Sequence, residues 1–143
     1  MDGEDVSDGI RTPNASMMAS AVSAKPAVRA FLLEMQRKLA RENNVVMDGR
    51  DIGTVVLPDA TVKIYLTATA KARAERRYKE LIQKGTAVKF EEVYDDMVKR
   101  DYNAMHREIA PLKQAEDAVL ADTTECDLDG SLELILKIIR ERI

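Results

Sequence analysis

The sequence predicts an α/β domain built on a parallel sheet. Short apolar segments alternate with amphipathic helical patterns along the 143 residues, which is the element order of such domains. Polar residues directly follow the apolar segments at 45–47 and 118–121. Open α/β sheets bind their ligands outside the carboxyl ends of parallel strands. We therefore expect a binding site at these two strand ends.

The first 41 residues are predicted to form a loop and two helices. Residues 1–13 are polar, contain two Gly and a Pro, and show no periodicity, as expected of a loop. Asn14 is placed to cap a short helix that ends near Ser23. Pro26 then begins an amphipathic helix over 26–41, because apolar residues recur there at i, i+3 and i+4.

The rest of the chain is predicted to contain three strands and three helices. The predicted strands cover 45–47, 61–68 and 118–121. The predicted helices cover 70–84, closed by Gly85, then 90–102, and a C-terminal segment capped by Asp129 or Ser131. Parallel sheets are usually wider than three strands and covered on both faces. This strand count leads us to expect that part of the domain is missing from the sequence.

Composition excludes several classes of protein. Hydrophobic residues at 45% and charged residues at 33% are typical of a soluble globular chain. Aromatic residues at 4%, no Trp and a net charge of −3 argue against binding to nucleic acid polymers. The single Cys126 allows no internal disulfide and fits a reducing compartment. The sequence shows no signal peptide and no apolar run of membrane-spanning length, so we expect a cytoplasmic protein.

The strongest candidate site follows the apolar residues 45–47, where Asp48-Gly49-Arg50-Asp51 ends a predicted buried strand. Two carboxylates and a guanidinium at a strand end suit a polar ligand, and Gly49 and Gly53 allow the backbone to approach it closely. The alternative is an ordinary turn with a surface ion pair. Of the 22 basic residues, 12 are Arg, the side chain suited to bidentate phosphate binding.

Further arginines can contribute to an anion site: Arg29, Arg73, Arg76, Arg77, Arg100 and Arg107. Arg73, Arg76 and Arg77 also have a simpler interpretation, because such residues usually form a solvated helix face with ion pairs one turn apart. His106 has no second ligand at metal-binding spacing, so we predict no metal site.

These residues carry a resemblance to bacterial cytidylate kinases, which transfer the γ-phosphoryl group of ATP to CMP and dCMP. Residues 46–60 (VMDGRDIGTVVLPDA) resemble the signature of this family. The similarity continues through GEDV at 3–6, IRTP at 10–13, Ser20, PAVR at 26–29, KIYLTA at 63–68, RAERR at 73–77, Arg100-Asp101 and REIAPL at 107–112. The resemblance implies a phosphate-loop nucleoside-monophosphate-kinase fold, with ATP and Mg²⁺ as cofactors.

The resemblance also implies a role for each matching residue. Ser20, Arg29 and Asp51 would read the cytosine edge, Arg50 and Arg107 would hold the acceptor α-phosphate, and Arg100 would lie near the ribose. Arg73, Arg76 and Arg77 would begin the lid over the ATP phosphates, with Arg50, Arg107, Arg76 and Arg77 in catalytic roles. Residues 1–41 would belong to the monophosphate-binding region, and 42–143 to the α/β core with a lid at about 73–100.

Two features depart from the family pattern. The family has an Asp three residues before the position of Arg107, where this chain has Ala104, so the ribose contact lacks its acceptor. The phosphate-loop motif G-x-x-x-x-G-K-[ST] occurs nowhere in the sequence. We therefore expect a carboxy-terminal part of a cytidylate kinase that is inactive alone. The alternatives are a non-catalytic nucleotide- or anion-binding module, or a fragment that self-associates or is complemented by the missing amino-terminal segment.

Overall fold

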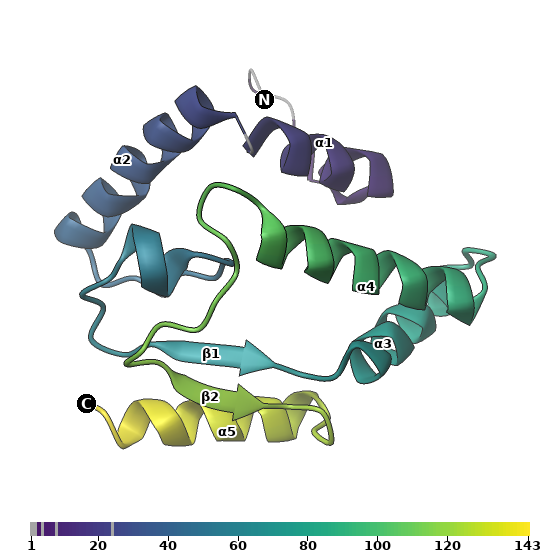
Figure 1. Cartoon of the computed structure of the whole chain (residues 1–143). Helices are drawn as coiled ribbons and strands as arrows, with labels where there is room; N and C mark the ends of the chain where they lie inside the picture. The colour runs from purple at the N-terminus through teal and green to yellow at the C-terminus, as the bar shows by residue number, and fades with distance from the viewer. Residues whose placement is uncertain (1–2, 4, 8, 24) are drawn as a thin grey trace. The chain divides into compact units, whose positions relative to one another are not determined.

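The computed structural model describes the chain apart from residues 1, 2, 4, 8 and 24 and the side chains of Arg11, Pro13, Ser16 and Ser20. The described chain divides into two compact units, Met1–Val46 and Met47–Ile143. Figure 1 labels the α-helices and strands of both. No helix in the described part is long and apolar enough to cross a membrane.

The Met1–Val46 unit is helical. It contains the 3₁₀-helix η1 (Gly9–Arg11), α1 (Pro13–Ser23) and α2 (Pro26–Glu42). The predicted helix at 26–41 is confirmed, and Pro26 occupies its first turn, where the missing N–H costs nothing. The cap predicted for α1 is wrong: Thr12 Oγ1 accepts the Ala15 N–H at 3.2 Å, so Thr12 caps this helix in place of Asn14.

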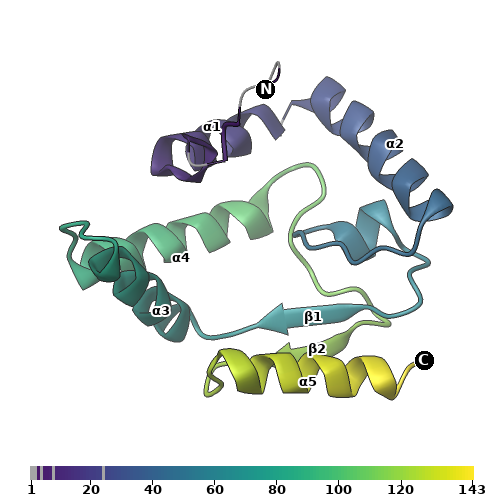
Figure 2. The ribbon, with the colours of Figure 1, turned by 180° about the vertical axis from the view of Figure 1, so that it is seen from behind.

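The Met47–Ile143 unit is an α/β layer structure around a parallel pair of strands. β1 (Ile64–Thr67) pairs with β2 (Val119–Asp122) in the register Ile64 to Val119 through Thr67 to Asp122. The helices are α3 (Ala70–Gln83), α4 (Phe90–His106) and α5 (Leu128–Arg140). Figures 1 and 2 show α5 on one side of the strands, with α4 on the other. The predicted α/β class with a parallel sheet is confirmed.

The strand predicted at 45–47 is wrong. Residues 44–48 carry no strand, and Val46 is fully exposed. A strand needs a neighbour for its N–H and C=O groups, and the sheet in the described chain consists of β1 and β2 alone. The polar segment that follows leads into a π-helical turn, η2 (Ile52–Val56). The sequence suggested that Asp48 to Asp51 end a strand; in the structure they do not.

Helix ends differ from the predictions in two further places. α4 continues to His106, beyond the predicted end at 102. α5 is capped by Asp127, whose Oδ1 accepts the Gly130 N–H at 2.8 Å, so neither Asp129 nor Ser131 is the cap. Asp127 was missed because the sequence offers several capping residue types within one turn.

Packing between α3 and α4 combines an ion pair with aromatic contacts. The Arg73 guanidinium donates to both carboxylate oxygens of Asp101, at 3.1 and 2.5 Å. This pairing holds the pKa of Arg73 above its ordinary value. The Tyr78 and Phe90 rings meet edge to face, with centroids 6.0 Å apart. Small residues dominate the buried apolar core. Among the described residues, this core consists of Val56, Ala68, Ala74, Ala104, Ala121 and Ile138.

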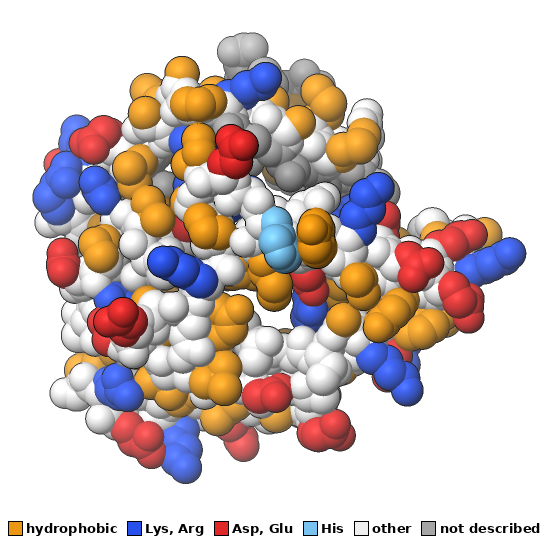
Figure 3. All heavy atoms as spheres, viewed as in Figure 1, with side chains coloured by type: hydrophobic (Ala, Val, Ile, Leu, Met, Phe, Trp, Pro, Cys, Tyr) orange, Lys and Arg blue, Asp and Glu red, His pale blue; other side chains and the backbone are white. Residues whose placement is uncertain are grey.

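Charges of both signs are interspersed over the face shown in Figure 3, between apolar side chains that reach the surface. This distribution agrees with the small net charge of −3.

Gly85 ends α3 in the way the sequence predicts. Its φ of +75° is left-handed, its N–H bonds the Ile82 carbonyl at 2.9 Å, and the Thr86 N–H bonds the Leu81 carbonyl at 2.9 Å. This pair of bonds is the Schellman motif. No atom lies within 4 Å of a Cβ built on Gly85, so any cost of a side chain there comes from the backbone conformation.

We expect Gly85→Ala to lower the free energy of unfolding by about 1 kcal/mol, because a Cβ disfavours the left-handed conformation. Gly85→Asn should lose less, since Asn tolerates this conformation better than Ala. Urea unfolding of the three proteins measures both effects. Equal stability of the wild type and Gly85→Ala would contradict the assigned helix end.

Candidate functional site

Asp51 and Arg107 form the centre of the candidate site. Arg107 Nη2 lies 3.5 Å from Asp51 Oδ1, with side-chain exposures of 30% and 13%. Asp51 stands at the N-terminal end of η2, and Arg107 directly follows α4. A partly buried carboxylate beside a guanidinium offers an acceptor and a cation to the same polar ligand.

Asp51 is held by the π-helical turn that follows it. Its carbonyl accepts the N–H groups of Val55 and Val56 at 2.9 and 3.2 Å, and the Leu57 N–H closes the turn on the Ile52 carbonyl at 2.7 Å. Single π turns often occur at functional sites. Apolar periodicity does not signal such a turn, because its five residues are too few to show a period.

Lys63 holds the segment that follows η2. Its side chain is 7% exposed, and its ammonium donates to the Pro58 carbonyl and to both Asp117 oxygens, at 2.8 and 2.6 Å. The bond from Lys63 holds the pKa of Asp117 below its ordinary value. A Cβ on Gly53 would lie 3.5 Å from Lys63 Cδ. Lys63 thus connects the segment after η2 to the turn before β2.

Arg107 is held by the loop that leaves α4. Its Nε donates to the Ala110 carbonyl, and the Leu112 N–H bonds the Ala104 carbonyl at 2.8 Å. The buried Nη2 atom has no hydrogen-bond acceptor within the described chain. A buried donor without an acceptor is costly, so this nitrogen is suited to receive an oxygen from a ligand.

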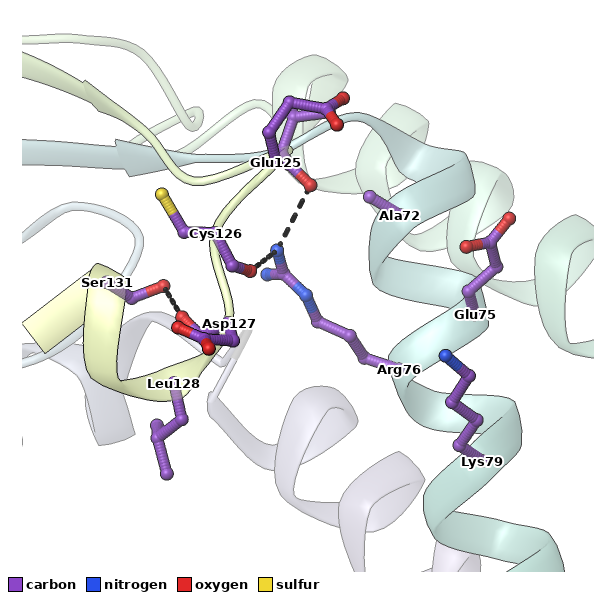
Figure 4. A pocket seen from close by; sticks show the side chains of 10 residues that line it. Ala72, Glu75, Arg76, Lys79, Glu125, Cys126, Asp127, Leu128 and Ser131 are labelled. Carbon is purple, nitrogen blue, oxygen red and sulfur yellow. Dashed lines mark hydrogen bonds between the residues drawn. The ribbon is translucent and has the colours of Figure 1, made fainter.

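A separate pocket of about 540 Å³ lies between α3 and the segment after β2 (Figure 4). Its lining residues are Ala72, Glu75, Arg76, Lys79, Thr124, Glu125, Cys126, Asp127, Leu128 and Ser131. The Arg76 guanidinium donates to the carbonyls of Thr123, Thr124 and Cys126. Arg76 therefore shapes the loop that forms one wall.

The pocket lies at the carboxyl end of the two strands, where the sequence predicts polar residues. The N–H and Oγ1 of Thr123 both donate to the Thr67 carbonyl, at 2.8 and 3.1 Å. The Thr69 N–H donates to Thr124 Oγ1 at 3.0 Å. These bonds join the end of β1 to the end of β2 and fix the start of α3 beside the pocket loop.

The other predicted arginines have separate surroundings. Arg77 pairs with Glu80 at 2.7 Å, and Arg100 lies 3.7 Å from Asp96. Lys84 and Arg77 together lower the pKa of Glu80 to about 2, with the Lys84 bond as the larger cause. Arg73, Arg76 and Arg77 thus bond separate sets of protein oxygens.

Three predicted residues remain to be located. Arg50 is exposed beside Asp51. Ser20 and Arg29 belong to the Met1–Val46 unit, in α1 and α2, and the side chain of Ser20 lies outside the described residues. No group of three or more His, Cys, Asp or Glu that could hold a metal ion occurs within the part of the chain that is described.

Ala104 lies on the buried side of α4 and is 2% exposed. A carboxyl group introduced there would be desolvated, which raises its pKa in the folded state above that in the unfolded chain. Its destabilising effect is then fully present above the folded-state pKa and shrinks as the pH falls through it.

We expect Ala104→Asp to lower the free energy of unfolding by about 3 kcal/mol at neutral pH, and by less near pH 4. Asn103→Asp is the matched control, because Asn103 is the exposed neighbour on the same helix. Urea unfolding at the two pH values measures the difference. A loss that is equal for both variants, or independent of pH, would contradict the burial of this position.

The family model and the relatives that match this chain all carry the same description. Residues 1–141 match the family model described as cytidylate kinase. The chain is similar to the cytidylate kinase of Thermosipho melanesiensis, with 47% identity over 99% of the chain and 65% of the relative. The cytidylate kinase of Carboxydothermus hydrogenoformans is 52% identical over 94% of the chain and 61% of its own length. The chain thus spans less than two thirds of the length of these relatives.

Proposed function

Because the chain belongs to the cytidylate kinase family, we propose that it provides the acceptor-binding side of an ATP-dependent CMP and dCMP phosphotransferase. The observation that carries this proposal is the pairing of Asp51 with Arg107 at 3.5 Å. A carboxylate can accept from an exocyclic amine, and a guanidinium can bind phosphate oxygens. Cytidine monophosphate carries both groups.

The individual roles are part of the proposal. Asp51 accepts from the cytosine amine; for Ser20 and Arg29, a role at the cytosine edge is the one that the family resemblance implies. Arg107 and the exposed Arg50 bind the acceptor phosphate, and Arg100 lies toward the ribose. The Nη2 atom of Arg107 supports the phosphate role, because it is ion-paired with Asp51 but makes no hydrogen bond among the described residues, and a phosphate oxygen would give this buried donor an acceptor.

ATP and Mg²⁺ are the cofactors that membership of the family implies, and ATP would supply the phosphoryl group. The pocket beside α3 has a volume usual for small-molecule sites. Its carboxylates, on Glu75, Glu125 and Asp127, outnumber the cations of Arg76 and Lys79. This charge suits a base and ribose hydroxyls better than phosphates. No group of three or more His, Cys, Asp or Glu that could hold a metal ion occurs among the described residues, so none of them is assigned to Mg²⁺.

We propose that Arg73, Arg76 and Arg77 lie on the ATP side, at the start of a lid over about 73–100. To bind phosphate there, each guanidinium would have to give up protein oxygens that it now bonds. Each of these guanidiniums already bonds protein oxygens. A phosphate would have to replace or share those bonds. Since the sequence contains no G-x-x-x-x-G-K-[ST] motif, we propose that the 143-residue polypeptide by itself binds CMP without transferring phosphate.

Titration with CMP and UMP tests the acceptor site. We expect the wild type to bind CMP roughly tenfold more tightly than UMP, because cytosine offers an amine that can donate to the Asp51 carboxylate, whereas uracil places a carbonyl oxygen, a second acceptor, against it. Asp51→Asn should remove most of this preference, since an amide can face either group.

Asp95→Ala is the control for loss of a carboxylate, because Asp95 is exposed on α4; it should keep the wild-type preference. Calorimetry or nuclear magnetic resonance measures the affinities. Equal binding of CMP and UMP by the wild type would refute the assignment of Asp51.

We also propose that the chain self-associates or is complemented by a further segment. The two-strand sheet leaves both outer edges without a neighbouring strand in the described chain, and such edges recruit other strands. Leu66 and Leu120 are each more than half exposed, and Leu128, Leu132 and Leu136 form an exposed stripe on α5.

Sedimentation velocity over a micromolar concentration series tests self-association. We expect a shift from monomer toward a larger species, and a weaker shift for Leu132→Glu, which puts a charge on the exposed stripe. Glu133→Gln is the control at the exposed neighbouring position of the same helix. A monomer at every concentration, with cooperative unfolding, would contradict self-association.

A further inference from the structure

We propose that Ala110 is a positioning residue for Arg107, an inference that rests on the proposed role of Arg107 in anion binding. Ala110 has a φ of +51° and is the one non-glycine residue with a positive φ in the described chain. Residues other than glycine rarely adopt this left-handed conformation, because Cβ crowds the following carbonyl oxygen.

Local sequence does not explain the conformation of Ala110. The next residue is Pro111, which favours an extended backbone at the residue before it. Ala also lacks the side-chain oxygen with which Asn and Asp support left-handed turns. The conformation must therefore be maintained by contacts of the surrounding loop.

Two hydrogen bonds supply those contacts. The Leu112 N–H bonds the Ala104 carbonyl at 2.8 Å and closes the loop onto the end of α4. Inside this loop, the Ala110 carbonyl accepts from Arg107 Nε. Because a charged donor makes a strong bond, this bond offsets the backbone strain. The left-handed turn directs the carbonyl back toward Arg107.

The consequence is a guanidinium held in one orientation. With Nε bonded, the planar group can no longer rotate freely, and Nη2 lies 3.5 Å from Asp51 Oδ1 while lacking a hydrogen-bond acceptor among the described residues. A cation fixed before its ligand arrives loses less conformational entropy on binding. Ala110 thus acts on anion binding through Arg107, without touching the ligand.

The test compares Ala110→Gly with Ala110→Val. Glycine adopts the left-handed conformation freely, whereas a β-branched residue is excluded from it. Ala87→Val is the matched control, because Ala87 is exposed in another loop without a positive φ. The first measurement is the Arg107 Nε–H signal in ¹H–¹⁵N spectra and its rate of exchange with solvent. The second is the affinity for CMP.

We expect Ala110→Gly and Ala87→Val to keep a slowly exchanging Nε–H signal and wild-type affinity for CMP. Ala110→Val should lose the protection of Nε–H and bind CMP roughly tenfold more weakly. A protected Nε–H in Ala110→Val would overturn the proposal, and so would unchanged CMP affinity despite its loss. If Ala110→Gly behaves like Ala110→Val, the left-handed turn is not what positions Arg107.

Failure of the proposed function gives a different result. The wild type would then not bind CMP, whereas the Nε–H exchange of the variants would still decide whether Ala110 orients Arg107. A thermal unfolding curve for each variant identifies a general loss of folding, which would broaden all amide signals and not the Nε–H signal alone. Loss of protection at the Arg107 Nε–H alone supports the positioning role of Ala110. Loss of all amide protection in Ala110→Val contradicts a role limited to Arg107.

Discussion

The Met47–Ile143 unit depends on the parallel pairing of β1 with β2. This pairing joins segments that are distant in the sequence, from Ile64 with Val119 to Thr67 with Asp122. At its carboxyl end the Thr67 carbonyl accepts two bonds from Thr123, which sets the start of the pocket loop. At its amino end Lys63, just before β1, bonds both Pro58 and Asp117. Loss of the strand pairing would release both loops.

The candidate acceptor site is built by irregular segments rather than by the sheet. Asp51 is placed by a π turn and Arg107 by a loop with a left-handed residue. Both segments are closed by internal hydrogen bonds, and these bonds restrict the two charged groups before any ligand arrives. Such restriction lets a site bind a small anion without a large apolar pocket.

The sequence predicts the regular elements well, because apolar periodicity and helix-ending residues are local properties. Pro26, Gly85 and the β-branched run at 61–68 all identify elements that the structure contains. The strand at 45–47 was wrong because strand formation depends on a partner, which hydrophobicity alone does not reveal. The fold class was open to sequence reasoning, and the family resemblance named Asp51 and Arg107 as separate candidates; that the two form an ion pair was not predicted. The roles of Lys63 and Ala110 were not, since each depends on backbone carbonyls whose direction only the folded chain defines.

We propose above that Asp51 and Arg107 form one acceptor site for a cytidine monophosphate. The most direct measurement is a map of chemical-shift changes during titration with CMP. Signals of Asp51, Arg107 and Ala110 should shift together, with one affinity, while those of the Arg77–Glu80 ion pair stay constant. Shifts confined to the pocket lined by Arg76 and Ser131, or no saturable shift at Asp51 and Arg107, would contradict this proposal.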